Sequence, residues 1–161
     1  MASTDSQVAG LSTLGMRLFY GVEETKGTKP TTYHELSRIN SIGGISIDVE
    51  TIDASALIDT TTKSIAGRGD LGGNFTVSVN ATEDTIAEWE SLISAYVSAK
   101  ADGKQTWFEI YHPDLDKAFF VVAEPPRQIP MPEVGQNELL VIEFTLIIND
   151  YRGMETAVLP A

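Results

Sequence analysis

The sequence predicts an α+β, mainly β domain: a β-sandwich or partly closed barrel with one flanking helix, a long inter-strand loop and extended terminal arms. Apolar and polar residues alternate along several segments, one stretch has helical spacing, and four prolines interrupt residues 124–135. The 161 residues fit one domain, 1–161, with an N-terminal arm at 1–15, a long loop at 23–44 and a C-terminal tail at 152–161.

Three segments in the first half alternate with period two, namely residues 16–22, 45–50 and 74–79. We expect each to be a half-buried strand with one apolar face. The polar face of the second segment consists of Ser46, Asp48 and Glu50.

A helix is predicted between Asn80 and Gly103. Asn80 and Glu83 have the spacing of a capping box, Lys100 lies near the end, and Gly103 is placed to stop the helix. Apolar residues at helical spacing predict the core-facing side. These are Ile86, Trp89, Leu92, Ile93 and Tyr96.

The second half predicts a hairpin and one long strand. Residues 107–112 and 118–123 are apolar or aromatic on both faces and are joined by a turn-rich loop. In 139–149 every even position is apolar, whereas the odd positions include Glu143 and Thr145. The proline-rich segment before that strand is a stiff, extended link that is unsuited to a central strand.

Charge and composition limit the classes of partner and of binding site that this protein can have. The 23 acidic and 11 basic residues give a net charge of −12, which opposes binding to phosphates and favours solubility. Without cysteine there are no disulfides and no thiolate metal sites. The N-terminus lacks the pattern of a signal peptide, and no apolar run reaches the ~20 residues that span a bilayer, so we expect no membrane partner.

Motifs that suggest chemistry have simpler interpretations. Gly67, Gly69 and Gly72 spell GxGxxG, but a strand follows where a dinucleotide site needs a helix, and the RGD at 68–70 is expected at a charged hairpin tip. His112, Asp114 and Asp116 form either a weak metal site or, more simply, a polar hairpin loop. No serine or threonine has a visible base, so we expect neither enzyme activity nor a cofactor.

The order of elements resembles that of the tail tube protein (major tail protein) of long, non-contractile phage tails. The similar motifs are an Ile-Gly-Gly at 42–44 before a strand with spaced acids, the K-x-I-A-G-x-G-D-x-G segment at 63–72, and the V-N-A-T-E-D step into the helix at 79–84. The resemblance covers residues 16–151 and extends to the tubes of contractile tails and type VI secretion.

This resemblance implies a structural virion protein of a siphophage tail, assembled in the host cytoplasm. Its copies would form hexameric rings that stack into a hollow tube around the tape measure protein, contact tail tip and terminator proteins, and conduct DNA during ejection. An anionic lumen would repel DNA phosphates. The lumen candidates are Ser46, Asp48 and Glu50, then Glu143 and Thr145. The candidates for contacts between rings are Tyr33, His34, Leu36 and Ile39, whose alternative role is to cover the domain's own core.

Other functions stay open. The chain is alternatively the tube subunit of a contractile tail or secretion system, or a tail terminator that forms single rings. A cell-surface adhesion or carbohydrate-binding module would use exposed aromatic residues such as Trp107 or Tyr111. A hydrolase would have to act through His112 and its neighbouring aspartates.

Overall fold

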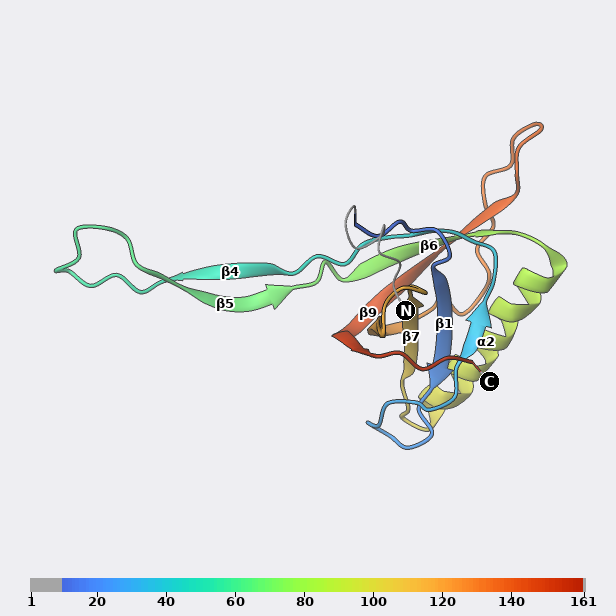
Figure 1. Ribbon diagram of the computed structural model, residues 1–161, viewed down its shortest axis with the longest axis horizontal. Coiled ribbons are helices and arrows are strands. Elements are labelled where there is room, and N and C mark those ends of the chain that lie inside the picture. The colour runs from blue at the N-terminus through green and yellow to red at the C-terminus, as the bar shows by residue number, and fades with distance from the viewer. Residues whose placement is uncertain (1–9, 161) are drawn as a thin grey trace.

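The computed structural model describes residues 10–160 and shows a mainly β structure with one long helix (Figure 1). This confirms the predicted fold class. The elements are β1 (Arg17–Val22), β2 (His34–Leu36), β3 (Ile39–Ile42), β4 (Asp48–Asp53), β5 (Ser64–Asp70), β6 (Asn74–Asn80), α2 (Glu83–Ala101), β7 (Thr106–Tyr111), β8 (Lys117–Glu124) and β9 (Val141–Thr156).

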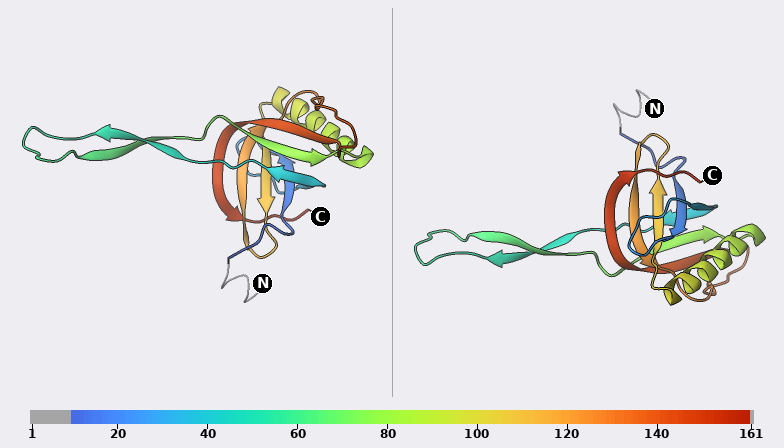
Figure 2. Two further views of the ribbon diagram at one scale, coloured as in Figure 1. Left: turned by 90° about the horizontal axis from the view of Figure 1, so that it is seen from above. Right: turned by 90° about the horizontal axis from the view of Figure 1, so that it is seen from below.

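Seven of the strands form one antiparallel sheet in the order β2-β1-β7-β8-β9-β6-β3. The 16-residue β9 pairs with β6 along its first half and with β8 along its second half. It curves strongly (Figure 2), and the pairing of β8 with β9 shifts register at two places, as at β-bulges. The sheet therefore folds over into two layers, while its edge strands β2 and β3 stay unpaired with each other within the described residues.

The main core lies between these two layers and α2. Leu18, Val77 and Phe108 from three different strands are fully buried there. Trp89 of α2 stacks on Phe144 of β9, with ring centroids 3.8 Å apart and planes within 7°. The helix is thus fixed to the strand that joins the layers.

The helix matches its prediction except at its first residues. Thr82, not Asn80, is the N-cap, and Thr82 and Thr85 form the capping box that was expected from Asn80 and Glu83. Asn80 is the last residue of β6, and its side chain instead accepts a hydrogen bond from Asn40. The expected core residues Trp89, Leu92, Ile93 and Tyr96 are buried, and Ile86 is partly buried against the same core.

The strand β1 is buried on both faces, although its pattern predicted one apolar face. Its second face belongs to a smaller cluster with Phe19, Tyr33, Trp107 and Phe120. The loop that follows β1 and residues 157–158 after β9 cover this cluster. β9 itself runs to Thr156, so the first half of the predicted tail at 152–161 is strand.

The predicted long loop at 23–44 contains β2 and β3 and is firmly attached to the domain. The buried carboxylate of Glu23 accepts hydrogen bonds from the backbone of Gln105 (2.9 Å), from Trp107 Nε1 (3.0 Å) and from the backbone of Gly27 (3.2 Å). Ser37 donates through its backbone and hydroxyl to Glu88 of α2. Two three-to-four-residue strands are too short for their periodicity to be visible in the sequence.

A second carboxyl, that of Glu109 in β7, is fully buried beneath the C-terminal residues. Oε2 accepts a hydrogen bond from the backbone of Val158 (3.0 Å), whereas Oε1 has no partner. Burial raises the pKa of Glu109 to about 7, against the smaller lowering effects of the Val158 N–H and of Lys29. The neutral acid is therefore the form that fits this site best.

We predict that Glu109 makes the protein less stable as the pH rises. Because the folded-state pKa exceeds the unfolded value, its contribution is fully present below about pH 4.5 and is lost as the pH rises through about 7. The free energy of unfolding of Glu109→Gln, relative to that of the native protein, should therefore be roughly 2 kcal/mol higher at pH 8 than at pH 5. Urea unfolding at both pH values measures this, with the exposed Glu143→Gln as the matched control; equal pH dependence in all three proteins would contradict it.

We also predict that Trp89→Ala lowers the free energy of unfolding by about 3–5 kcal/mol, because it removes a fully buried ring stacked on Phe144. Val97→Ala, on the exposed side of the same helix, should cost less than about 1 kcal/mol. Chemical denaturation followed by circular dichroism compares the two. A Trp89→Ala effect as small as that of Val97→Ala would show that the helix does not hold the layers together.

Candidate assembly surface

β4 and β5 form a separate two-stranded hairpin that projects far from the body (Figures 1 and 2). Every residue of β4 is exposed, and Ile47 and Val49 retain more than half of their accessible surface. The prediction of a half-buried strand at 45–50 was therefore wrong. Alternation reports that one face differs from the other, but it does not report whether a second layer covers the apolar face.

The pairing register divides the hairpin into an acidic face and an apolar face near its root. Asp48 lies directly opposite Asp70, and alternation places Glu50 on the same face. Ile47 and Val49 occupy the other face. Like charges opposite one another destabilise a sheet, and the exposure of aliphatic side chains to water is unfavourable. Neither face is explained by the stability of the lone subunit.

The tip of the hairpin presents two fully accessible aliphatic side chains, those of Leu57 (107% exposed) and Ile58 (90% exposed). The turn that carries them is ordered by its own hydrogen bonds. Asp59 Oδ2 accepts from the backbone of Ala56 (2.7 Å), and Ser55 Oγ accepts from the backbone of Lys63 (2.8 Å). Leu57 and Ile58 thus form an ordered apolar knob at the end of the two-stranded hairpin.

Gly67 and Gly69 of the glycine motif lie in β5, and so does the RGD sequence, which was expected at a hairpin tip. A Cβ at Gly69 would stand 2.9 Å from Cγ2 of Ile47, and one at Gly67 would stand 3.1 Å from Cδ1 of Ile52. These glycines therefore leave room for the side chains of Ile47, which precedes β4, and of Ile52 in β4. Only Gly72, with φ of +83°, belongs to the turn that leads into β6.

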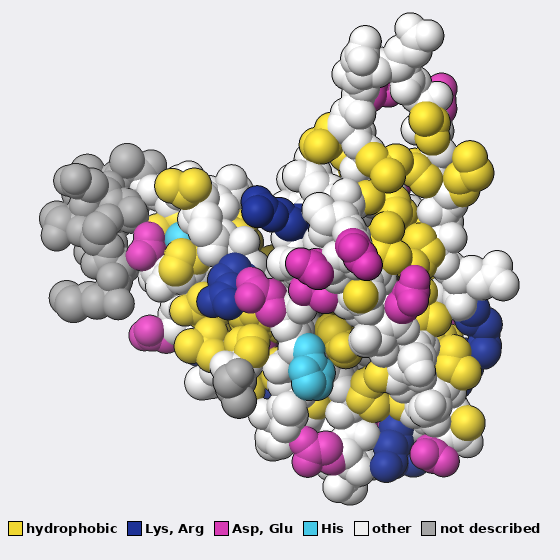
Figure 3. All heavy atoms as spheres, turned by 90° about the vertical axis from the view of Figure 1, so that its right-hand side faces the viewer, with side chains coloured by type: hydrophobic (Ala, Val, Ile, Leu, Met, Phe, Trp, Pro, Cys, Tyr) yellow, Lys and Arg dark blue, Asp and Glu magenta, His cyan; other side chains and the backbone are white. Residues whose placement is uncertain are grey.

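A second exposed apolar segment is the proline-rich connection between β8 and β9. It protrudes at the opposite end of the body from the hairpin (Figure 1), and hydrophobic side chains gather over it (Figure 3). Met131, Val134 and Leu139 each keep about two thirds or more of their surface exposed. No strand forms between residues 125 and 140, as the prolines predicted.

The remaining predicted site residues differ in how far they are exposed. Glu143 and Thr145 are exposed on β9, on the face opposite the core. Tyr33 and Leu36, proposed for contacts between rings, are buried, so they serve the alternative role of covering their own core. His34 is exposed and Ile39 is partly exposed.

The histidine of the β7–β8 turn is held by local bonds, one of them from the backbone of Asp114. His112 is buried, its Nδ1 accepts from the backbone of Asp114 (3.0 Å), and Nε2 therefore donates to the carbonyl of Ser12 (2.5 Å). Across residues 10–160 no three histidine, aspartate or glutamate side chains are grouped as metal ligands. In the same residues, no helix combines the length and apolarity that crossing a bilayer requires.

The hairpin could have been recognised from the distribution of aromatic residues. No Phe, Tyr or Trp occurs between Tyr33 and Phe75, whereas the five central strands of the sheet all contain at least one. Large aromatic side chains dominate cores, so a long stretch without them that still carries strand periodicity indicates a ribbon outside the core.

Comparison with solved structures finds chains of similar fold. A chain of the anti-feeding prophage cap (tube terminating cap) has a TM-score of 0.54 at 16% identity, over 88% of this chain and 89% of that chain. A chain of the tail of an empty GTA particle, determined with C6 symmetry, has a TM-score of 0.50 at 14% identity, over 87% and 95%. A chain of the anti-feeding prophage baseplate has a TM-score of 0.44 at 15% identity, over 89% and 94%. No protein-family model and no curated protein matches the sequence.

We predict that the hairpin is dispensable for folding. Its strands pair only with each other and their residues are exposed, so replacing 47–71 with a short Gly-Ser linker should change the free energy of unfolding by less than about 1 kcal/mol. Thermal and urea unfolding of the shortened and full-length proteins tests this. A loss of cooperative unfolding in the shortened protein would contradict it.

Proposed function

We propose that the chain is a structural protein of a phage tail that assembles with copies of itself into stacked rings forming a hollow tail tube. The observation that carries the proposal is the projecting hairpin, whose apolar and acidic faces contact nothing in its own subunit. Exposed apolar surface of this extent marks interaction sites. The shared fold with chains of a tube cap and of a tail supports the choice of assembly.

A projecting hairpin that meets a different surface of an identical copy makes a head-to-tail contact. Such contacts close into a ring when the rotation divides a full turn, and they otherwise continue as a filament. The tail of the GTA particle has C6 symmetry, which supports rings of six for this chain. The unpaired edges of β2 and β3 would then be covered by neighbours, which removes a site of aggregation.

The helix-free face of β6 and β9 is the face that we propose for the lumen. It carries Glu143 and Thr145 opposite Ser78 and Thr76, with no large apolar side chain at these four positions. Together with the net charge of −12, such a wall repels phosphates, so DNA passes without sticking. Ser46, Asp48 and Glu50 of the hairpin would extend the acidic surface. The tape measure protein would occupy the lumen before DNA, and tail tip and terminator proteins would meet the tube ends.

A tail terminator is the second candidate. It is favoured by the TM-score of 0.54 with the chain of the tube terminating cap. A terminator would form single rings, whereas a tube subunit continues to stack. Neither role assigns catalysis or a cofactor to the chain.

We predict that the purified protein assembles as its concentration rises, because burying the hairpin on a neighbour is favoured by mass action. Electron microscopy with light scattering on the same sample should find hollow tubes, while the variant with the shortened hairpin stays monomeric at every concentration. Single, unstacked rings would select the terminator. Folded monomers of the full-length protein at all concentrations, including after addition of tail tips as nuclei, would overturn the proposal.

A further inference from the structure

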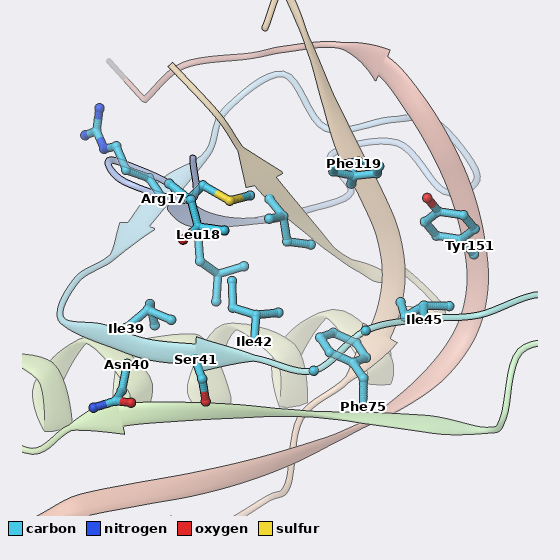
Figure 4. Close-up of a pocket in the computed structure, with 15 residues that line it drawn as sticks. Arg17, Leu18, Ile39, Asn40, Ser41, Ile42, Ile45, Phe75, Phe119 and Tyr151 are labelled. Carbon is cyan, nitrogen blue, oxygen red and sulfur yellow. The ribbon is translucent and has the colours of Figure 1, made fainter. Parts of the chain in front are cut away.

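The two layers of the sheet leave an open apolar cleft of about 550 Å³ between the N-terminal end of β1 and the segment after β3. Figure 4 shows the residues that line it, which include residues of β1, β3, β6, β7, β8 and β9 and of the segment after β3. The cleft is large enough for a drug-sized molecule. Its apolar lining includes Ile39, Ile42, Ile45, Phe75, Phe119 and Tyr151.

The cleft lies at the root of the hairpin. Gly43, Gly44 and Ile45, which line it, lead into β4, and Phe75 follows the turn that ends β5. Every subunit therefore carries an apolar cleft at one end of the hairpin and the apolar knob, Leu57 and Ile58, at the other end. The hairpin points away from the body, so a subunit cannot fill its own cleft with its own tip (Figure 2).

We propose that Leu57 and Ile58 of one copy insert into the cleft of a second copy. The inference rests on the proposed self-assembly and identifies the pair of surfaces that makes it. The chemistry matches, because an ordered aliphatic knob meets a concave wall of aliphatic and aromatic side chains. The turn is already held by Asp59 and Ser55, so little ordering is needed on binding.

Contact between apolar surfaces, not charge, carries this pairing. The guanidinium of Arg17 packs over the ring of Phe19 and forms a bidentate pair with Glu35 (2.7 and 2.8 Å), and Figure 4 shows it directed away from the cleft.

The contact also sets a distance. Residues 45–58, fully extended at about 3.3 Å each, span at most about 45 Å. Tip and cleft lie at opposite ends of this span in each subunit, so copies joined tip to cleft repeat along the hairpin direction at no more than about that spacing.

Disulfide trapping tests the contact, because the native chain contains no cysteine. A Leu57→Cys protein is mixed with an Ile45→Cys protein of different tag length and oxidised, and the heterodimer is measured on a non-reducing gel. The matched control replaces Ile45→Cys with Val97→Cys on the exposed side of α2. We expect several-fold more heterodimer with Ile45→Cys, and a covalent ladder from the double variant, since each copy then has one cysteine at each surface. Equal yields with the two partners would overturn the inference.

Charge substitutions give an independent readout. Leu57→Asp with Ile58→Asp should raise the concentration for half-assembly about tenfold or more, whereas Thr60→Asp with Thr61→Asp adds the same charge to exposed positions of the tip and should raise it less. Equal shifts in the two variants would overturn the inference. Failure of the proposed function is seen separately, in electron microscopy of the native protein. Native tubes without selective trapping would refute only the knob-and-cleft contact.

Discussion

Two layers of sheet share one continuous strand, and the rest of the structure depends on this strand. β9 pairs with β6 through its first half and with β8 through its second, so its curvature brings the two sets of apolar side chains face to face. The stack of Trp89 on Phe144 fixes α2 to the strand near its first half. If β9 were straight, the same sheet would be flat and its apolar face would be open to water.

The chain separates its apolar residues into two sets with different roles. The first set consists of the aromatic residues and the buried aliphatic residues. These pack inside the domain and cover both faces of β1 and β8. A second set, including Ile47, Val49, Leu57 and Ile58, is displayed on a ribbon that pairs only with itself. Assembly through this second set leaves the core unchanged, so a subunit with this division can fold first and associate afterwards.

Buried carboxyl groups attach the irregular segments to the body. Glu23 gathers three donors from the loop after β1 and from the start of β7, and Glu109 holds the backbone of Val158. These segments cover the second face of the sheet, which would otherwise be an exposed apolar patch. Because the loops cover the sheet only there, the polar face of β6 and β9 stays free of helix and loop.

The sequence by itself determined the fold class, the helix with four of its five expected core residues buried, the β7–β8 hairpin and the long final strand. In these segments the periodic pattern is long and includes aromatic residues, so it predicts a buried apolar face. Tertiary structure alone decided the rest. The alternation at 45–50 is the same whether its apolar face meets a core or a second copy, and only the position of neighbouring strands distinguishes the two. Likewise Tyr33 and Leu36 look like free anchors in an irregular loop until Glu23 and Ser37 are seen to hold that loop against the domain. Local pattern specifies which side chains share a face, whereas what covers that face depends on contacts between residues far apart in the chain.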